Sequence, residues 1–181
     1  MTASHADHIV SAIEDHRARN DEFLRLAPDS PIPDEEREAF EGLAYYPVDL
    51  AYRVEGLALS PYDGDEPEAF DMPTSKDDLR RARRAGMFRF GLDGRELALT
   101  AYDLGDGGLF VPFLDATSGA ETYGAGRYLD LEAEPDGTFT LDFNLAYHPY
   151  CVYSPRYSCP LTPPENRLPL RITAGERLPK V

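Results

Sequence analysis

The chain has 181 residues, and its 18 basic and 33 acidic side chains give a formal net charge of −15. This charge excludes nucleic acid as an expected partner, because phosphate binding requires a basic patch. The composition (42% hydrophobic, 28% charged) is that of a globular protein. The sequence has no apolar run of membrane-spanning length and no basic or apolar leader segment. It therefore predicts a cytoplasmic protein without membrane contact.

Two helices are expected at the start of the chain. Residues 4–26 read as an amphipathic helix, and Ser4 with Asp7 three positions later forms a capping-box pattern at its beginning. The apolar face of this helix would contain Ile9, Ile13 and either Phe23 or Leu24. A second, shorter helix is predicted over residues 33–40.

From Tyr45 onward the pattern changes to strands. Residues 50–59 alternate loosely, and residues 62–78 read as a polar loop. Asp93-Gly94 is a strong signal for a two-residue hairpin turn, which pairs Phe90 with Leu97 and Phe88 with Leu99.

A second hairpin is predicted between residues 127–134 and 138–144. A three-residue loop with Gly137 in the left-handed conformation keeps the apolar faces together, pairing Ala133 with Phe139, Leu131 with Leu141 and Leu129 with Phe143. On the other face the same register sets Tyr128 opposite Asn144 and Asp130 opposite Asp142.

The final strand is expected over residues 168–173, with Leu168, Leu170 and Ile172 pointing inward. Many short strands after two helices predict an α+β, mainly β fold, an antiparallel barrel or sandwich preceded by two N-terminal helices. We expect one domain over residues 1–181, with a helical segment over 1–42 and a β-rich body over 43–181.

Only two of the 18 basic residues are lysines, Lys76 and Lys180. Excess carboxylates with few lysines suit a protein that stays hydrated in concentrated salt, although a genome rich in GC gives the same preference for arginine. Because salt screens self-repulsion, we expect the melting temperature to rise from dilute buffer to molar KCl. A thermal melt that is flat or falls with added KCl would contradict the halophile interpretation.

Residues 113–176 are unusually dense in polar, aromatic, glycine and proline residues, so we expect a functional site there. Pro149 and Pro155 interrupt any helix in the last part of this segment. The tyrosines near them either cover the core or line the mouth of a pocket, and they are Tyr147, Tyr150, Tyr153 and Tyr157.

Arg127 falls on the inward face of its predicted strand, and a buried guanidinium needs a partner. Asp115 or Glu165 would make it a structural ion pair. In the alternative, Arg127 is a hook for a small anionic ligand, helped by the backbone of Tyr123, Gly124 and Gly126. The full predicted ligand-binding set is Tyr123, Gly124, Gly126, Arg127, Tyr128, Asn144 and Tyr147.

Two carboxylates facing each other across strands repel, unless they are hydrated, bridged by a cation, or share a proton for acid–base work. Asp130 and Asp142, with His148, are therefore the candidate catalytic residues for a hydrolase or isomerase.

A metal is not required by the sequence, and no cofactor is implied. The residues with suitable side chains are His148, Cys151, Cys159 and Glu165, or Asp142 in place of Glu165, but their spacing matches no standard zinc motif. Cys151 and Cys159 are expected as free thiols, with a disulfide as the alternative.

Several motifs in the chain resemble one known family. They lie at residues 42–47, 73–75, 115–119, 122–130, 141–151, 159–166 and 174–176. The chain is similar to the bacterial and archaeal family called domain of unknown function 1684, and the resemblance covers nearly the whole sequence. That family commonly has Asn where this chain has His148, which weakens any role that needs an imidazole. The resemblance implies no activity.

Three functions follow from these observations. We favour a module that binds an anionic or aromatic small molecule. The alternatives are the hydrolase or isomerase described above and a structural or interaction protein without a ligand site. A homodimer is compatible with these observations.

Overall fold

The computed structural model describes residues 4–179 and begins with the predicted helix. Helix α1 spans His5–Leu26. The Ser4 hydroxyl accepts the N–H of Asp7, and the Asp7 carboxylate accepts the N–H of Ser4, so both groups of the capping box are satisfied. Ile13 and Leu24 form its buried face. Helix α2 is shorter than expected, at Asp34–Arg37.

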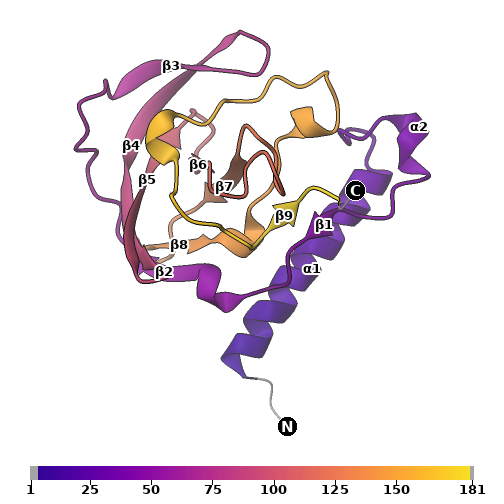
Figure 1. The fold of residues 1–181 in the computed structure, drawn as a ribbon, viewed down its shortest axis with the longest axis horizontal. Coiled ribbons are helices and arrows are strands. Elements are labelled where there is room, and N and C mark those ends of the chain that lie inside the picture. Colours follow the sequence, from indigo (N-terminus) through magenta and orange to yellow (C-terminus); the bar gives the residue numbers. More distant parts are fainter. Residues whose placement is uncertain (1–3, 180–181) are drawn as a thin grey trace.

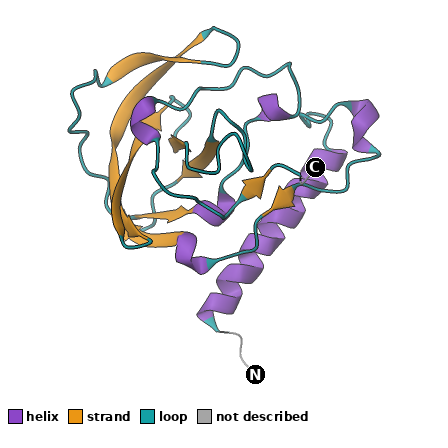
Figure 2. Ribbon diagram, viewed as in Figure 1, coloured by secondary structure: helices purple, strands orange, loops and turns teal. Residues whose placement is uncertain are grey.

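The main sheet is antiparallel and has five strands in the order β3-β4-β5-β6-β7 (Figures 1 and 2). Their bounds are Ala69–Pro73 for β3, Leu79–Leu92 for β4, Arg95–Asp103 for β5, Leu109–Phe113 for β6 and Arg127–Leu131 for β7. Two separate pairs complete the strands, one of β1 (Ala44–Tyr45) with β9 (Glu176–Arg177) and one of β2 (Arg53–Leu57) with β8 (Phe139–Asp142). Short 3₁₀ helices cover Leu50–Tyr52, Phe143–Leu145, Tyr150–Val152 and Pro164–Asn166.

The mainly β, α+β class is confirmed, but the five-stranded sheet does not close into a barrel. β3 and β7 are its two edges, and they do not pair with each other. Among the described residues, the sheet continues beyond β7 as an isolated bridge between Tyr128 and Tyr147. Figure 1 shows β4 and β5 curving around one side, with the C-terminal segment crossing the space that they enclose.

The hairpin at Asp93-Gly94 has the predicted register, with Phe90 opposite Leu97 and Phe88 opposite Leu99. Both pairs are buried in the main core. The register follows from the sequence because the two-residue turn fixes it locally.

The predicted hairpin over residues 127–144 is wrong in its pairing. β7 pairs with β6, setting Asp130 opposite Phe110, whereas β8 pairs with β2, setting Asp142 opposite Arg53. The turn itself is present: the Glu134 N–H donates to the Thr138 carbonyl, and Gly137 has a φ of 82°. Beyond this turn the two strands part, because each finds an apolar partner elsewhere in the chain.

Two further expectations need correction. The polar segment over residues 62–78 contains β3, since the long strand β4 extends past its hairpin and offers an edge to residues 69–73. Residues 168–173 form no strand, although Leu168, Leu170 and Ile172 are buried as expected. The last strand is instead the short β9. No helix in the described part of the chain is long and apolar enough to span a membrane.

Candidate functional site

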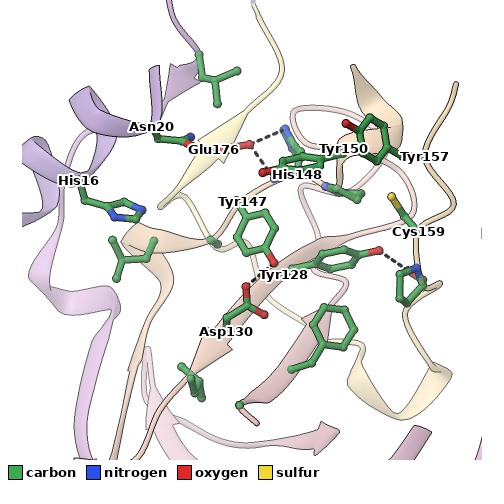
Figure 3. A pocket seen from close by; sticks show the side chains of 18 of the residues that line it. His16, Asn20, Tyr128, Asp130, Tyr147, His148, Tyr150, Tyr157, Cys159 and Glu176 are labelled. Carbon is green, nitrogen blue, oxygen red and sulfur yellow. Dashed lines mark hydrogen bonds and ion pairs between the residues drawn. The ribbon is translucent and has the colours of Figure 1, made fainter. Parts of the chain in front are cut away.

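A cleft of about 720 Å³ lies between helix α1 and the β6–β7 side of the main sheet. His16, Arg17 and Asn20 of α1 form one wall, and Tyr128 and Asp130 of β7 contribute to the opposite side (Figure 3). The loop that follows β8 and the strand β9 close the cleft with further polar side chains, which are Tyr147, His148, Tyr150, Tyr153, Tyr157, Ser158 and Glu176.

Tyrosine rings make up much of the cleft surface. All four tyrosines singled out in the loop line it, together with Tyr128. The Tyr128 and Tyr147 rings meet edge to face with centroids 5.7 Å apart, and the Tyr150 and Tyr157 rings do so at 5.2 Å. Such pairs hold each ring in a fixed orientation, so the cleft has preformed aromatic walls.

Asp130 is held beside these rings at the more open part of the cleft. The Tyr147 hydroxyl donates to Asp130 Oδ2 at 2.6 Å. Partial withdrawal of the carboxyl from water raises the pKa of Asp130, and the Tyr147 hydrogen bond opposes this shift. The same burial, with the neighbouring carboxylate, raises the pKa of Tyr147, so its hydroxyl stays protonated as the donor.

Glu176 is the most deeply buried carboxyl of the cleft. Gly175 before it has a φ of 77°, and a Cβ at that position would lie 2.6 Å from the carbonyl oxygens of Phe143 and Ala146. Only glycine therefore allows β9 to approach this loop so closely. The approach brings Glu176 to the cleft, where it is only 3% exposed.

The Glu176 carboxyl uses one oxygen for all its hydrogen bonds to the described residues. Oε2 accepts the backbone N–H of His148 at 2.7 Å and the Tyr153 hydroxyl at 2.9 Å (Figure 3). Desolvation raises the pKa of Glu176 to about 7, against the opposing effect of these hydrogen bonds and of Arg127. The carboxyl therefore exchanges its proton near neutral pH.

His148 is a poor proton donor in this position. Its Nε2 accepts the backbone N–H of Tyr123 at 3.2 Å, and its Nδ1 lies 3.5 Å from Glu176 Oε2. Burial, with the nearby Arg127 charge, lowers the pKa of His148 to about 3. We therefore treat the contact with Glu176 as one between a neutral imidazole and a carboxyl, and not as an ion pair.

The predicted Asp130/Asp142 pair is not formed. Asp142 is buried outside the cleft, where its Oδ2 lies 2.6 Å from Arg53 and its Oδ1 accepts the N–H of Asn144. Asp130 lies on β7 with Tyr147 as its partner. The two carboxyls belong to different strand pairs, so this structure gives no basis for catalysis by the two together.

Arg127 is inward, as predicted, but it is structural. Its guanidinium is 0% exposed and does not line the cleft. It donates to the carbonyls of Ile172, Ala174 and Glu176 and lies 3.6 Å from Asp115. These contacts hold the C-terminal segment and supply the partner that the buried charge requires, so the structural ion pair accounts for Arg127 without an anion. The other proposed partner, Glu165, instead pairs with Arg84 at 2.8 Å.

The remaining predicted ligand residues divide into two groups. Tyr123, Gly124 and Gly126 lie outside the cleft, and the backbone of Gly126 packs against the carbonyl of Phe113. Asn144 lines the cleft, but its amide group is bonded to the backbone N–H and carbonyl of Asp49. Only Tyr128, Tyr147 and Asn144 of the predicted set reach the cleft.

The candidate metal ligands are not gathered around one point. Across residues 4–179, no three His, Cys, Asp or Glu side chains are placed to hold a metal ion. Cys151 and Cys159 are free thiols, and the Cys151 N–H donates to Cys159 Sγ at 3.3 Å. Burial raises the pKa of Cys159 to about 11, which disfavours the thiolate that a metal or a nucleophilic mechanism needs.

The sequence did not point to Glu176 or to helix α1 as parts of the site. The one available signal for Glu176 was its place in the motif Ala174–Glu176. His16 and Asn20 gave no signal, because polar residues on an amphipathic helix read as a solvated face.

The family model described as "Protein of unknown function (DUF1684)" matches residues 38–177, so the chain belongs to this family. The resemblance seen in the motifs is thereby confirmed. None of the curated proteins with which the chain was compared matches it.

The chain is also similar to a solved structure, a solution NMR structure of the uncharacterized protein from gene locus rrnAC0354 of Haloarcula marismortui. The two are 40% identical, the match covers 95% of each chain, and the TM-score is 0.69. This neighbour supports the fold and leaves the function to be argued from the site.

Proposed function

We propose that this protein binds a small organic molecule in the cleft between α1 and β7. The observation that carries this proposal is the combination of a cavity of about 720 Å³ with preformed tyrosine walls. Ligand sites are typically clefts of about 300–1,000 Å³ with aromatic and apolar walls and a few convergent polar groups. Asp130 and Glu176 supply such groups here.

The aromatic ligand of the original hypothesis fits this cleft better than the anionic one. The basic side chains that line it are already engaged with protein groups. Arg17 donates to the carbonyls of Tyr46 and Asn144, and Arg80 lies 3.6 Å from Asp106. An anion entering the cleft would meet four carboxyls, and the two guanidiniums that could offset them already bond to protein groups.

One observation favours an enzyme as the second candidate. A carboxyl that exchanges its proton near neutral pH, placed in a cleft, has the property that a general acid or base requires. In that case Glu176 takes the role first assigned to Asp130 and Asp142, and a ligand found for the cleft would be turned over.

A tryptophan that fills the cleft provides the test. His16 is on the cleft wall, whereas His8 is exposed on the same helix outside the cleft. In a screen of small aromatic compounds by ligand-observed NMR, we expect hits whose affinity falls about tenfold or more, or about 1.4 kcal/mol, in His16→Trp. The matched variant His8→Trp should retain wild-type affinity.

If the hits bind the His16→Trp and His8→Trp variants with equal affinity, their binding site lies elsewhere on the protein. A screen without any hit would favour the third function, a structural or interaction protein.

A further inference from the structure

We infer that the ligand of this cleft is an organic amine, whose ammonium group is held by Glu176 and Asp130 while its apolar body lies against the tyrosines. This inference rests on the proposed function, because it names the chemical class of the molecule that the same cleft binds. It is carried by the carboxyls and the tyrosine rings that line the same cleft.

The first free acceptor is on Glu176. This residue is only 3% exposed and lines the cleft. Both hydrogen bonds that it accepts from described residues are made to Oε2. Within residues 4–179, Oε1 receives no hydrogen bond. Oε1 is therefore available to accept a hydrogen bond from a ligand that brings an N–H group.

The second free acceptor is on Asp130. Its Oδ2 accepts the Tyr147 hydroxyl, and no described residue donates to its Oδ1. Asp106 and Glu132 also line this part of the cleft. The cleft therefore has four carboxyls, of which Glu176 is buried and the other three are exposed. Together they attract a positively charged ligand.

Several donors of the cleft are used within the protein. The Arg17 guanidinium lies 4.5 Å from the centre of the Tyr45 ring and bonds to two carbonyls, and the hydroxyls of Tyr128 and Tyr153 donate to Pro160 and Glu176. Burial, with Arg19 and Arg17, lowers the pKa of His16, which keeps this imidazole neutral. The lining holds four carboxyls against the two guanidiniums of Arg17 and Arg80, which favours a ligand that brings a positive charge.

The aromatic walls suit the same class of ligand. An ammonium group within about 6 Å of a tyrosine ring is attracted by the negative face of the ring, and this attraction grows when water is excluded. Tyr147 carries both features, because its ring lines the cleft and its hydroxyl holds Asp130. An amine with an aromatic or aliphatic body would use the rings and the carboxyls together.

The charge around Glu176 determines how binding depends on pH. The titratable and charged groups that face it come from α1, β1, β7 and the loop after β8, and they are Arg17, Asp21, Tyr45, Arg127, His148, Tyr150 and Tyr153. An ammonium ion binds the ionised carboxylate, so affinity should rise as the pH increases through about 7. Near that pH, binding should release a proton from Glu176.

Tyramine and 4-ethylphenol form a matched pair of probes, since they differ by the ammonium group. Isothermal titration calorimetry in 1 M KCl, where the Debye length is about 3 Å, suppresses non-specific attraction to the acidic surface. We expect tyramine to bind at least about tenfold more tightly than 4-ethylphenol, the lower limit for a hydrogen bond to a charged group. Spermidine serves as a second, aliphatic amine.

Glu176→Gln removes the charge while the amide oxygen still accepts from His148 and Tyr153. We expect this variant to lose about tenfold or more in tyramine affinity, and to lose the proton release seen for wild type at pH 6.5 in buffers of different ionisation enthalpy. Glu22→Gln, on the exposed part of α1, makes the same charge change outside the cleft and should bind as wild type does.

Equal binding of tyramine and 4-ethylphenol, both weakened by His16→Trp, would overturn the amine inference and leave the proposed function standing. Failure of tyramine and spermidine to bind would overturn it as well. The proposed function would fall only if the aromatic screen gave no hits, or gave hits that His16→Trp does not weaken. If Glu176→Gln does not fold, wild-type affinity measured from pH 5.5 to 8 decides: a rise supports the inference, and a flat profile overturns it.

Discussion

Replacing Arg127 with methionine is expected to lower the free energy of unfolding by about 3–5 kcal/mol, the cost of breaking a buried ion pair. Arg127 is fully buried, and its guanidinium joins Asp115 to three carbonyls of the C-terminal segment. The substitution leaves the Asp115 carboxylate buried with only its hydrogen bonds from Thr117, Ser118 and Ile172. Chemical denaturation in high salt measures the loss.

Arg89→Met is the matched control for this prediction. Arg89 pairs with Asp63, but its side chain is 54% exposed, so its removal should cost no more than about 1 kcal/mol. An Arg127→Met variant as stable as Arg89→Met would contradict the structural role. Stabilisation of wild type by phosphate or small carboxylates, lost in Arg127→Met, would restore the anion hook.

Glu176→Gln is expected to change the pH dependence of stability. The pKa of Glu176 is about 7 in the folded protein and 4.5 for an unperturbed glutamate, so between these values the folded state binds more protons than the unfolded state. The contribution of the Glu176 carboxyl to the free energy of unfolding is therefore fully present below pH 4.5, and it is lost as the pH rises through 7. At 1.36 kcal/mol per pH unit, the loss is about 3 kcal/mol.

The glutamine variant cannot lose this stability, because its side chain does not ionise. The difference in unfolding free energy between Glu176→Gln and wild type should therefore move in favour of the variant by about 2.5 kcal/mol from pH 5 to pH 8. Glu22→Gln should follow the wild-type curve. Parallel curves for Glu176→Gln and wild type would show that the Glu176 carboxyl titrates as an exposed one does.

Local signals in the sequence were sufficient for several elements. Ser4 and Asp7 specify the start of α1 through contacts three residues apart. Asp93-Gly94 specifies the β4–β5 register in the same way. Alternation also predicted correctly that Leu129 and Leu141 are buried, because the period of a strand determines which face is inward.

The choice of neighbouring strand could not be read from the same patterns. Leu129 fits a position opposite Phe143 or opposite Val111 equally well, and the structure uses Val111 of β6. The preference depends on which distant strand has an unpaired apolar edge after the whole chain has folded. The predicted Asp130/Asp142 pair is wrong because it was derived from a pairing of β7 with β8 that the structure does not contain.

The candidate site was predictable only where its residues are close in the sequence. The tyrosines of the loop after β8 are recognisable as a group, and they line the cleft. His16 lies more than a hundred residues before Asp130, and Asp130 lies tens of residues before Glu176. Only the packing of α1 and β9 around the loop after β8 brings the three side chains to one cleft. No spacing rule relates residues that meet in this way.

Chemical-shift mapping by two-dimensional ¹H–¹⁵N NMR tests the cleft most directly as the site of a small organic amine. With tyramine in 1 M KCl, we predict the largest shifts at the backbone amides of residues lining the cleft, in α1 near His16, in β7 near Asp130, and around Tyr147 and Glu176. Small shifts spread over the acidic surface, or shifts concentrated away from these four segments, would contradict the account.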